Sequence, residues 1–135
     1  MTGHTVLHTL LSRPYPAVMG VLNVTPDSFS DAGQFLEPQH AFRQARRMIA
    51  EGADIIDVGA ESTRPYGSTA ISADEEIRRL KPVLPEIIAL GVPVSIDSMK
   101  ADVVDWALRL GAVIANDVWG LQRDPDMARV VAAHR

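Results

Sequence analysis

The sequence contains no cysteine in its 135 residues, which excludes disulfides, thiolate metal sites and cysteine nucleophiles. It also lacks any run of Lys or Arg, and its formal net charge is -4, so nucleic acid and anionic membranes are not expected partners. No stretch of about 18 apolar residues is present, and the N-terminus lacks the basic and apolar segments of a secretion signal. We therefore expect a cytoplasmic protein with no nucleic-acid and no membrane partner.

Several motifs that carry chemistry are also missing from the sequence. There is no glycine-rich phosphate loop of the G-x-G-x-x-G or Walker type. The four histidines are scattered without metal-ligand spacing, and no Ser-His-Asp arrangement can be assigned. These absences disfavour a zinc site made by the protein alone and a nucleophilic mechanism. Magnesium is compatible with them, because this hard cation takes most of its ligands from phosphate groups and water.

What the sequence does contain is a repeated alternation of short apolar segments and helical patterns. The apolar segments predict strands at residues 17–22, 54–59, 92–97 and 112–117. Apolar residues at helical spacing follow each strand and predict helices at 39–51, 73–90, 99–110 and 125–135. Ser72 and Glu75 form a capping-box pattern before the second of these helices. Two prolines, Pro82 and Pro85, are expected to kink or split that helix.

The alternation of strands and helices predicts an α/β fold in one domain. Strands that are apolar throughout, separated by helices, are typical of a parallel sheet covered by helices. Two architectures are compatible with this pattern, a doubly wound sheet and a (β/α)8 barrel. A barrel needs about 250 residues, and the chain supplies about half of that length. Length alone therefore favours a small doubly wound domain.

Polar residues stand at the ends of all four predicted strands. Asn23 follows the first, Glu61 follows the second, Asp97 ends the third and Asn116 ends the fourth. In parallel α/β folds the carboxyl ends of the strands carry the ligand site. Ser98 and Asp117 have an equally good explanation as caps of the following helices. Asn23 does not, because a long loop separates it from its helix, and long structured loops are often functional.

The loop at 60–72 contains a second group of polar residues. Arg64 follows two hydroxyl side chains, and Pro65 restricts it towards an extended shape. An arginine fork beside hydroxyls is suited to hold a carboxylate or a phosphate. The alternative is a solvated arginine that pairs with Glu61 or Asp57.

Four segments together are similar to the signature segments of the dihydropteroate synthase family: MGVLNVTPDSFSDAGQF, GADIIDVGAESTRP, VSIDS and IANDV. The resemblance runs in order and spacing from about residue 13 onward. The first two segments are long and specific, whereas pterin-binding methyltransferase domains have strand ends like the last two. The resemblance implies a TIM-type (β/α)8 barrel, of which residues 1–135 would be the N-terminal half of a pterin-binding domain. It overrules the preference based on length.

The resemblance also implies an enzyme of folate biosynthesis and a sulfonamide target. The family condenses 6-hydroxymethyl-7,8-dihydropterin pyrophosphate with 4-aminobenzoate to give 7,8-dihydropteroate and pyrophosphate, with magnesium assisting the departure of pyrophosphate. A homodimer is expected for the complete enzyme. Two alternatives are a non-catalytic half-barrel that associates with itself and a pterin-binding methyltransferase domain, which would have no use for the long first loop.

The resemblance assigns roles to individual residues. Asn23 is expected to contact magnesium and the pyrophosphate, and Asp97 and Asn116 to be the catalytic pair that binds the pterin. A fixed carboxylate at Asp97 would stabilise positive charge that develops on the dihydropterin. The expected loop contacts to the substrates are Phe29 and Asp31 in the first loop, and Thr63, Arg64 and Pro65 in the second.

Two positions depart from the family pattern. Tyr66 lengthens the second loop by about one residue, and Ala32 replaces a commoner glycine. The family's later strands bring a further Asp, a Lys and a C-terminal Arg with a nearby His, none of which falls within this pattern. The 135 residues alone are therefore expected to carry half of an active site.

Overall fold

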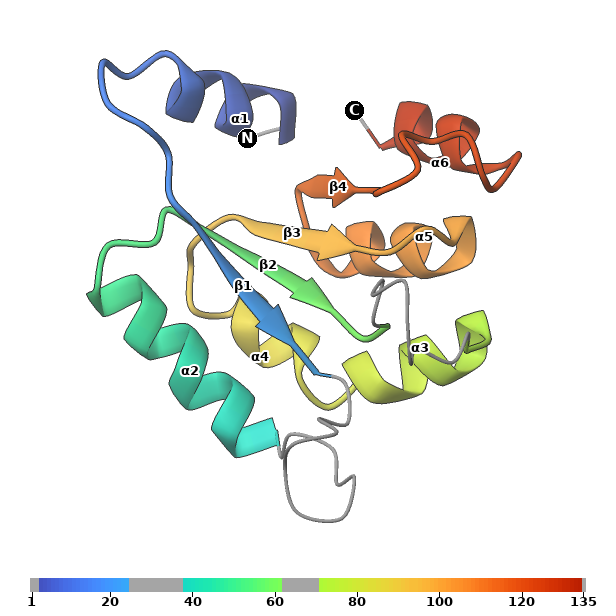
Figure 1. The fold of residues 1–135 in the computed structure, drawn as a ribbon, viewed down its shortest axis with the longest axis horizontal. Helices are drawn as coiled ribbons and strands as arrows, with labels where there is room; N and C mark the ends of the chain where they lie inside the picture. Colours follow the sequence, from blue (N-terminus) through green and yellow to red (C-terminus); the bar gives the residue numbers. More distant parts are fainter. Residues whose placement is uncertain (1–2, 25–37, 62–70, 135) are drawn as a thin grey trace.

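The computed structural model describes residues 3–24, 38–61 and 71–134. Four parallel strands form one sheet in the order β1-β2-β3-β4, as Figure 1 shows. They are β1 (Met19–Asn23), β2 (Ile55–Gly59), β3 (Val94–Asp97) and β4 (Ile114–Asn116). The four strand segments predicted from the apolar pattern are confirmed, with boundaries within two residues.

The predicted helices are confirmed as well, and one further helix is present. The helices are α1 (Gly3–Leu11), α2 (Pro38–Ala50), α3 (Ala73–Leu80), α4 (Leu84–Ile88), α5 (Ala101–Leu110) and α6 (Met127–Ala133). Ser72 caps α3 by accepting a hydrogen bond of 3.1 Å from the backbone N–H of Glu75. The two prolines split the predicted helix into α3 and α4. Only α1 was not predicted from the sequence. None of the helices among the described residues is long and apolar enough to cross a membrane.

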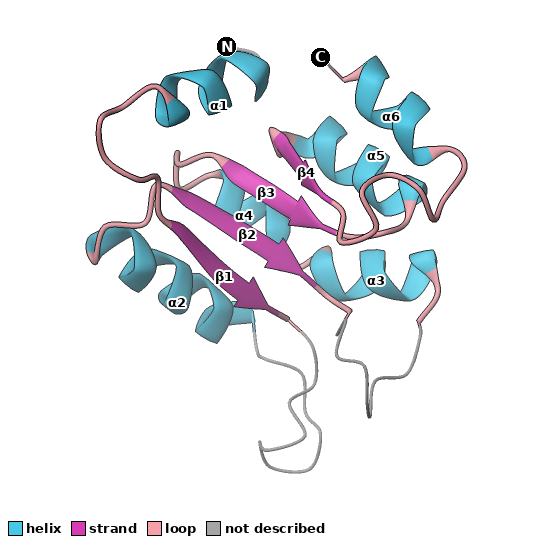
Figure 2. Ribbon diagram, turned by 45° about the horizontal axis from the view of Figure 1, so that its top comes forward, coloured by secondary structure: helices cyan, strands magenta, loops and turns pink. Residues whose placement is uncertain are grey.

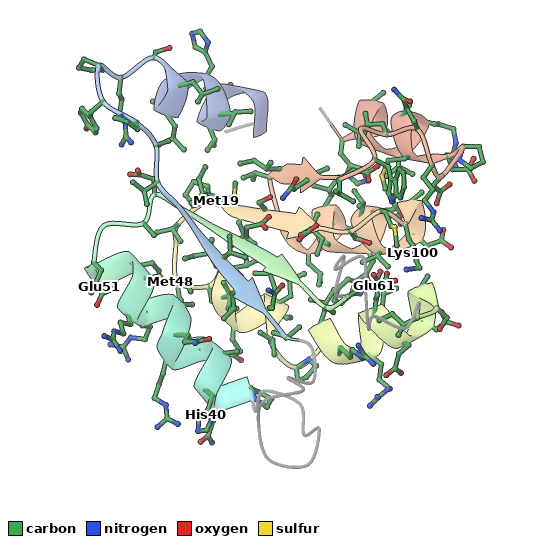
Figure 3. All side chains as sticks on the ribbon, viewed as in Figure 1. Met19, His40, Met48, Glu51, Glu61 and Lys100 are labelled. Atoms are coloured by element: carbon green, nitrogen blue, oxygen red, sulfur yellow. The ribbon has the colours of Figure 1, made fainter. Side chains whose placement is uncertain are left out.

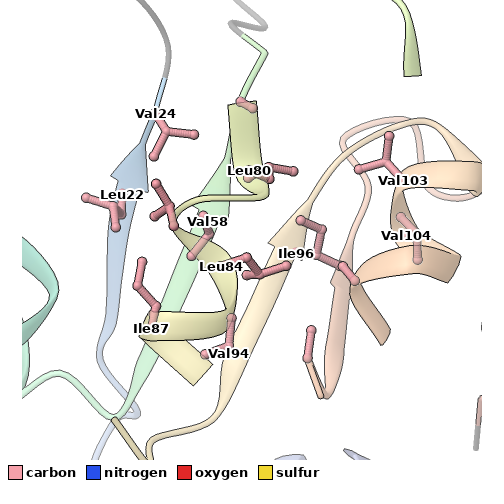
Figure 4. Packing of buried hydrophobic residues seen from close by; sticks show 14 of the residues in the cluster. Leu22, Val24, Val58, Leu80, Leu84, Ile87, Val94, Ile96, Val103 and Val104 are labelled. Carbon is pink, nitrogen blue, oxygen red and sulfur yellow. The ribbon is translucent and has the colours of Figure 1, made fainter. Parts of the chain in front are cut away.

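The hydrophobic core lies between one face of the sheet and helices α2 to α5 (Figures 2 and 4). Alternate strand residues point to this face, since side chains on a strand alternate between its two sides. The apolar strand residues buried on this face are Leu22, Ile56, Val58, Val94 and Ile96, and Val24 directly after β1 joins them. They pack against helix residues that include Leu80, Leu84, Ile87, Val103 and Val104. This packing leaves the opposite face of the sheet to Val21, Asp57, Ser95 and their neighbours.

The strand order corrects the expectation based on length. A doubly wound sheet reverses its strand order at a switch point and carries helices on both faces. Here the strands follow one another in chain order, and the helices between them lie on one face. The physical reason is that successive right-handed crossovers in one direction place every connecting helix on the same side. This is the arrangement of the first four units of a (β/α)8 barrel.

The face of the sheet opposite the helices is partly open to solvent. Val21 is 55% exposed and Met19 is 39% exposed, although both are apolar strand residues. In a closed barrel this face is the interior, which is filled by side chains from all of the strands. The exposed apolar residues are therefore those that further strands of a barrel would cover.

Candidate functional site

Three of the predicted site residues lie in one line across the carboxyl end of the sheet. Asn23 pairs in register with Gly59, Gly59 with Asp97, and Asp97 with Asn116. Register partners in a sheet direct their side chains to the same face, here the face away from the helices. We call these four residues the terminal row. The expectation that Asn23, Asp97 and Asn116 share one end of the molecule is confirmed, and their chemical roles remain predictions.

Gly59 occupies the position between Asn23 and Asp97 in the terminal row. A Cβ atom added to it would lie 3.2 Å from both the Cβ and the Oδ2 of Asp97, and 3.3 Å from the Asp97 backbone oxygen. These distances are shorter than ordinary carbon contacts in folded proteins. The glycine therefore leaves the Asp97 carboxylate room to occupy the centre of the row.

A second carboxylate, Asp57, lies beneath the terminal row on the same face of the sheet. It is only 3% exposed, and its two carboxylate oxygens each accept a hydrogen bond of 3.3 Å from the Nδ2 of Asn116. Asp57 was not among the residues predicted for the site. The signal for it was an ionisable residue in the middle of an otherwise apolar strand, since buried charges are rare without a function or a partner.

The electrostatic environment makes Asp97 a weaker acid than an ordinary aspartate. Burial, followed by the negative charges of Asp57 and Asp117, raises the pKa of Asp97 to about 6. Near neutral pH its carboxylate is thus ionised and poorly neutralised by the described residues. Such a carboxylate is suited to stabilise a ligand that carries, or develops, positive charge.

Two polar residues next to the terminal row have structural roles, although not the predicted one of capping the following helices. The cap positions of α5 and α6 are Lys100 and Asp126 instead. The carboxylate oxygens of Asp117 accept hydrogen bonds from the backbone N–H groups of Trp119 (2.9 Å) and Leu121 (3.0 Å). The Ser98 hydroxyl accepts from the backbone N–H of Lys100 at 3.2 Å. Both side chains therefore hold the turns that follow β4 and β3.

A largely buried polar cluster lies beyond the ends of β2 and β3, where Figure 3 shows Glu61 and Lys100 close together. Glu76 and Ser98 complete it through their hydrogen bonds. The Lys100 ammonium donates to the Glu61 carboxylate and, at 3.3 Å, to Glu76 Oε1. The Ser98 hydroxyl donates to Glu76 Oε2 at 3.0 Å. We call these four residues the Lys100 cluster. Sequence reasoning missed it, since its members come from three separate elements. The alternative that Glu61 pairs with Arg64 is not tested, because Arg64 lies outside the described residues.

The two glutamates of the Lys100 cluster titrate in opposite directions. Burial, together with a hydrogen bond to Glu61, raises the pKa of Glu76 to about 7. Burial would also raise the pKa of Glu61, but its hydrogen bonds to Glu76 and Lys100 outweigh this effect and lower the pKa. One lysine thus faces two carboxyl groups, and Glu76 is the one that retains a proton more readily.

The predicted loop contacts cannot be placed. Phe29, Asp31, Thr63, Arg64 and Pro65 all lie outside the described residues, as do Ala32 and Tyr66, the two positions that depart from the family pattern.

The oxygen atoms that the terminal row offers determine which metal ion it could hold. Among residues 3–24, 38–61 and 71–134, no group of three or more His, Asp or Glu side chains is arranged to hold a metal ion. Asn23 offers one amide oxygen at the edge of the row. A single protein oxygen fits Mg²⁺, which keeps several waters and takes further oxygens from substrate phosphates. It does not fit zinc, which needs three or four protein ligands.

Comparison with known proteins relates this chain to one protein family. Residues 19–135 match the family model described as pterin binding enzyme. The chain is 50% identical over 132 residues to the dihydropteroate synthase of Bacillus subtilis. The aligned residues make up 97% of this chain and 46% of that protein. The chain thus spans about half the length of the curated relatives that it matches.

Solved structures agree with the sequence relatives. The dihydropteroate synthase of Clostridium difficile, determined in the presence of pteroic acid, matches with a TM-score of 0.80 and 50% identity over 87% of this chain and 45% of that one. The Thermus thermophilus enzyme in complex with 6HMPPP matches with a TM-score of 0.70 and 47% identity, over 87% of this chain and 40% of that one. These matches confirm the fold class expected from the resemblance, a partial barrel of four β/α units.

Proposed function

Because the chain belongs to the pterin binding enzyme family, we propose that it supplies the first four β/α units of a dihydropteroate synthase. In this proposal the full-length gene product condenses 6-hydroxymethyl-7,8-dihydropterin pyrophosphate with 4-aminobenzoate and releases 7,8-dihydropteroate and pyrophosphate. The observation that carries the proposal is the terminal row, which collects Asn23, Asp97 and Asn116 at one end of a parallel sheet. Related dihydropteroate synthase structures determined with pteroic acid, 6HMPPP and 4-aminobenzoic acid support the ligand classes.

Asp97 and Asn116 are the residues of the terminal row that would bind the pterin. A pterin edge presents N–H and amino donors, which a carboxylate and an amide oxygen accept in one plane. As the C–O bond to pyrophosphate breaks, positive charge develops on the dihydropterin. The amine nitrogen of 4-aminobenzoate then forms the new C–N bond and releases one proton to solvent. The ionised Asp97 carboxylate would stabilise this charge more strongly in the transition state than in the ground state.

Asn23 is the described residue that would hold magnesium and the pyrophosphate. Its amide oxygen ends β1 at the edge of the terminal row, on the same face as Asp97. When bound, the metal would neutralise the charge of the leaving pyrophosphate. Asn23 itself would orient the pyrophosphate at one end of the row, while Asp97 and Asn116 fix the pterin at the other end.

Five further contacts belong to this proposal and come from the family resemblance. They are Phe29 and Asp31, which would close over the site, and Thr63, Arg64 and Pro65, which would line the aminobenzoate pocket. The proposal also places the protein in the cytoplasm, as a homodimer.

The proposed function is tested by measuring pyrophosphate release from the full-length gene product. We expect release only when both the dihydropterin pyrophosphate and 4-aminobenzoate are present, with one dihydropteroate formed per pyrophosphate. Chelation with EDTA should abolish release, and added Mg²⁺ should restore it. Binding of a methylated folate without any release of pyrophosphate would instead identify a methyltransferase domain and refute the proposal.

The space left by Gly59 gives a prediction about pterin affinity. Gly59→Ala places a methyl group against the Asp97 carboxylate, at the 3.2 Å distances given above, and should displace that carboxylate. We expect the KM for the pterin substrate to rise about tenfold, the loss of roughly one charge-assisted hydrogen bond. The KM for 4-aminobenzoate should change little.

Gly20→Ala is the matched control for this substitution. Gly20 is also a strand glycine, but its added Cβ would meet Met48 Sδ at 2.8 Å on the helix-covered face. It should lower thermal stability and leave the pterin KM unchanged. An equal rise of the pterin KM in both variants would contradict the role assigned to Gly59.

A further inference from the structure

Asp57 is a buried carboxylate with an unusual set of partners. It is 3% exposed, yet no Lys or Arg among the described residues forms a salt bridge with it. Its hydrogen bonds within the described part of the chain come from a single neutral group, the side-chain amide of Asn116, 59 residues away in the sequence. Burying a carboxylate without a cation costs free energy, and its position directly beneath the terminal row indicates a role there.

We propose that Asp57 is a positioning residue that holds the Asn116 amide in one orientation, with its carbonyl oxygen turned towards the ligand. A carboxylate can only accept hydrogen bonds, whereas a side-chain amide has a donor end and an acceptor end. Both Asp57 oxygens lie 3.3 Å from Nδ2, so the NH₂ group is turned down towards Asp57. The carbonyl oxygen of Asn116 is therefore directed away from Asp57.

This orientation determines what the site can recognise, and the argument rests on the proposed function. With the carbonyl oxygen of Asn116 and the carboxylate of Asp97 side by side in the terminal row, two adjacent positions both offer acceptors. They select the edge of a heterocycle that presents neighbouring N–H donors and reject an edge that presents acceptors. Without Asp57, the amide could rotate and offer its NH₂ group instead, which would weaken this selection.

The test compares Asp57→Asn with Asp117→Asn in the full-length gene product. Both substitutions remove one of the two negative charges that raise the pKa of Asp97, so their electrostatic effects on Asp97 run in the same direction. Only Asp57→Asn also changes the group that orients Asn116, because an amide at position 57 offers a donor as well as an acceptor and no longer fixes which end of Asn116 faces it. We expect the Kd of the dihydropterin pyrophosphate, measured by calorimetry, to rise about tenfold in Asp57→Asn and less than twofold in Asp117→Asn. The KM for 4-aminobenzoate should stay within twofold in both.

A double variant, Asp57→Asn with Asn116→Asp, provides the rescue. It keeps the hydrogen bond and the total charge but exchanges donor and acceptor, and an acceptor oxygen still faces the ligand. It should fold even if Asp57→Asn does not, and its pterin Kd should return to within about threefold of the unaltered protein. A double variant that binds as weakly as Asp57→Asn, or an equal loss in Asp117→Asn, would overturn the role of Asp57. A failure of the proposed function would look different, because the unaltered protein would then neither bind the pterin nor release pyrophosphate.

Discussion

Replacing Asp97 by Ala should lower the kcat of the full-length gene product about 100-fold, the usual cost of removing a fixed charge stabiliser from a site. The reason is that Asp97 lies at the centre of the terminal row, with Gly59 on one side and Asn116 on the other, where positive charge would develop on the pterin. Unchanged turnover would refute its assigned role. Asp102→Ala is the matched control, since Asp102 is an exposed carboxylate on the neighbouring helix α5 and should have no effect.

The dependence of the rate on pH provides a second measurement on Asp97. Its pKa is raised to about 6, so the carboxylate is mostly ionised at pH 7.5 and mostly protonated at pH 5. We expect kcat/KM to fall as the pH decreases through about 6, and this decline to be absent in Asp97→Asn. A raised carboxyl pKa also means that folding disfavours the ionised form, so Asp97 lowers stability once the pH exceeds its ordinary value. Asp97→Asn should therefore be no less stable than the unaltered protein at pH 7.5, which separates loss of activity from loss of fold.

Replacing Lys100 by Met should lower the free energy of unfolding by about 3 kcal/mol, the lower end of the cost of breaking a buried ion pair. Lys100 is the cation of the Lys100 cluster, and the side chains of its partners Glu61 and Glu76 are only 6% and 1% exposed. Methionine preserves most of the length of the side chain but leaves two carboxyl groups buried together. Urea denaturation of the full-length gene product at pH 7.5 measures the loss. Lys81→Met, at an exposed position after α3, is the control and should change stability by less than about 0.5 kcal/mol.

The same variant should regain stability in acid. Without the lysine, both glutamates have raised pKa values in the folded state, and each is more easily accommodated when it is protonated. The loss should be complete near pH 8 and should shrink as the pH falls towards the ordinary carboxyl pKa of about 4.5. A loss that is the same at pH 5 and pH 8 would show that packing of the Lys100 stem, rather than its charge, stabilises the cluster.

Much of the fold could be predicted because its signals are local. The four strands were apparent as short apolar segments, and the capping pattern of Ser72 with Glu75 marks the start of α3. The prolines at 82 and 85 predicted the division between α3 and α4. Length was misleading, because it favoured a doubly wound sheet; strand order depends on contacts between distant segments, and the length of a chain carries no information about them.

The candidate site could be predicted only in part. Asn23, Asp97 and Asn116 were identifiable because polar residues at strand ends follow a topological rule. Asp57 and Gly59 were not assigned to the site. Asp57 stood out as a charge in an apolar strand, but its partner, the Asn116 amide, lies on another strand, and so does Asp97, for which Gly59 leaves space. The Lys100 cluster joins residues 39 and 24 positions apart, a distance that no local pattern spans.

By itself, the sequence determined which segments become strands and helices, and that polar groups end each strand, since these properties follow from side-chain period, capping and backbone restriction along the chain. The tertiary structure alone decided the register that sets Asn23, Asp97 and Asn116 in one row, the orientation of the Asn116 amide over Asp57, and the pairing of one lysine with two buried glutamates. The reason is that hydrogen bonds and charge interactions act over a few ångströms in space, and only folding brings residues from separate strands within that range.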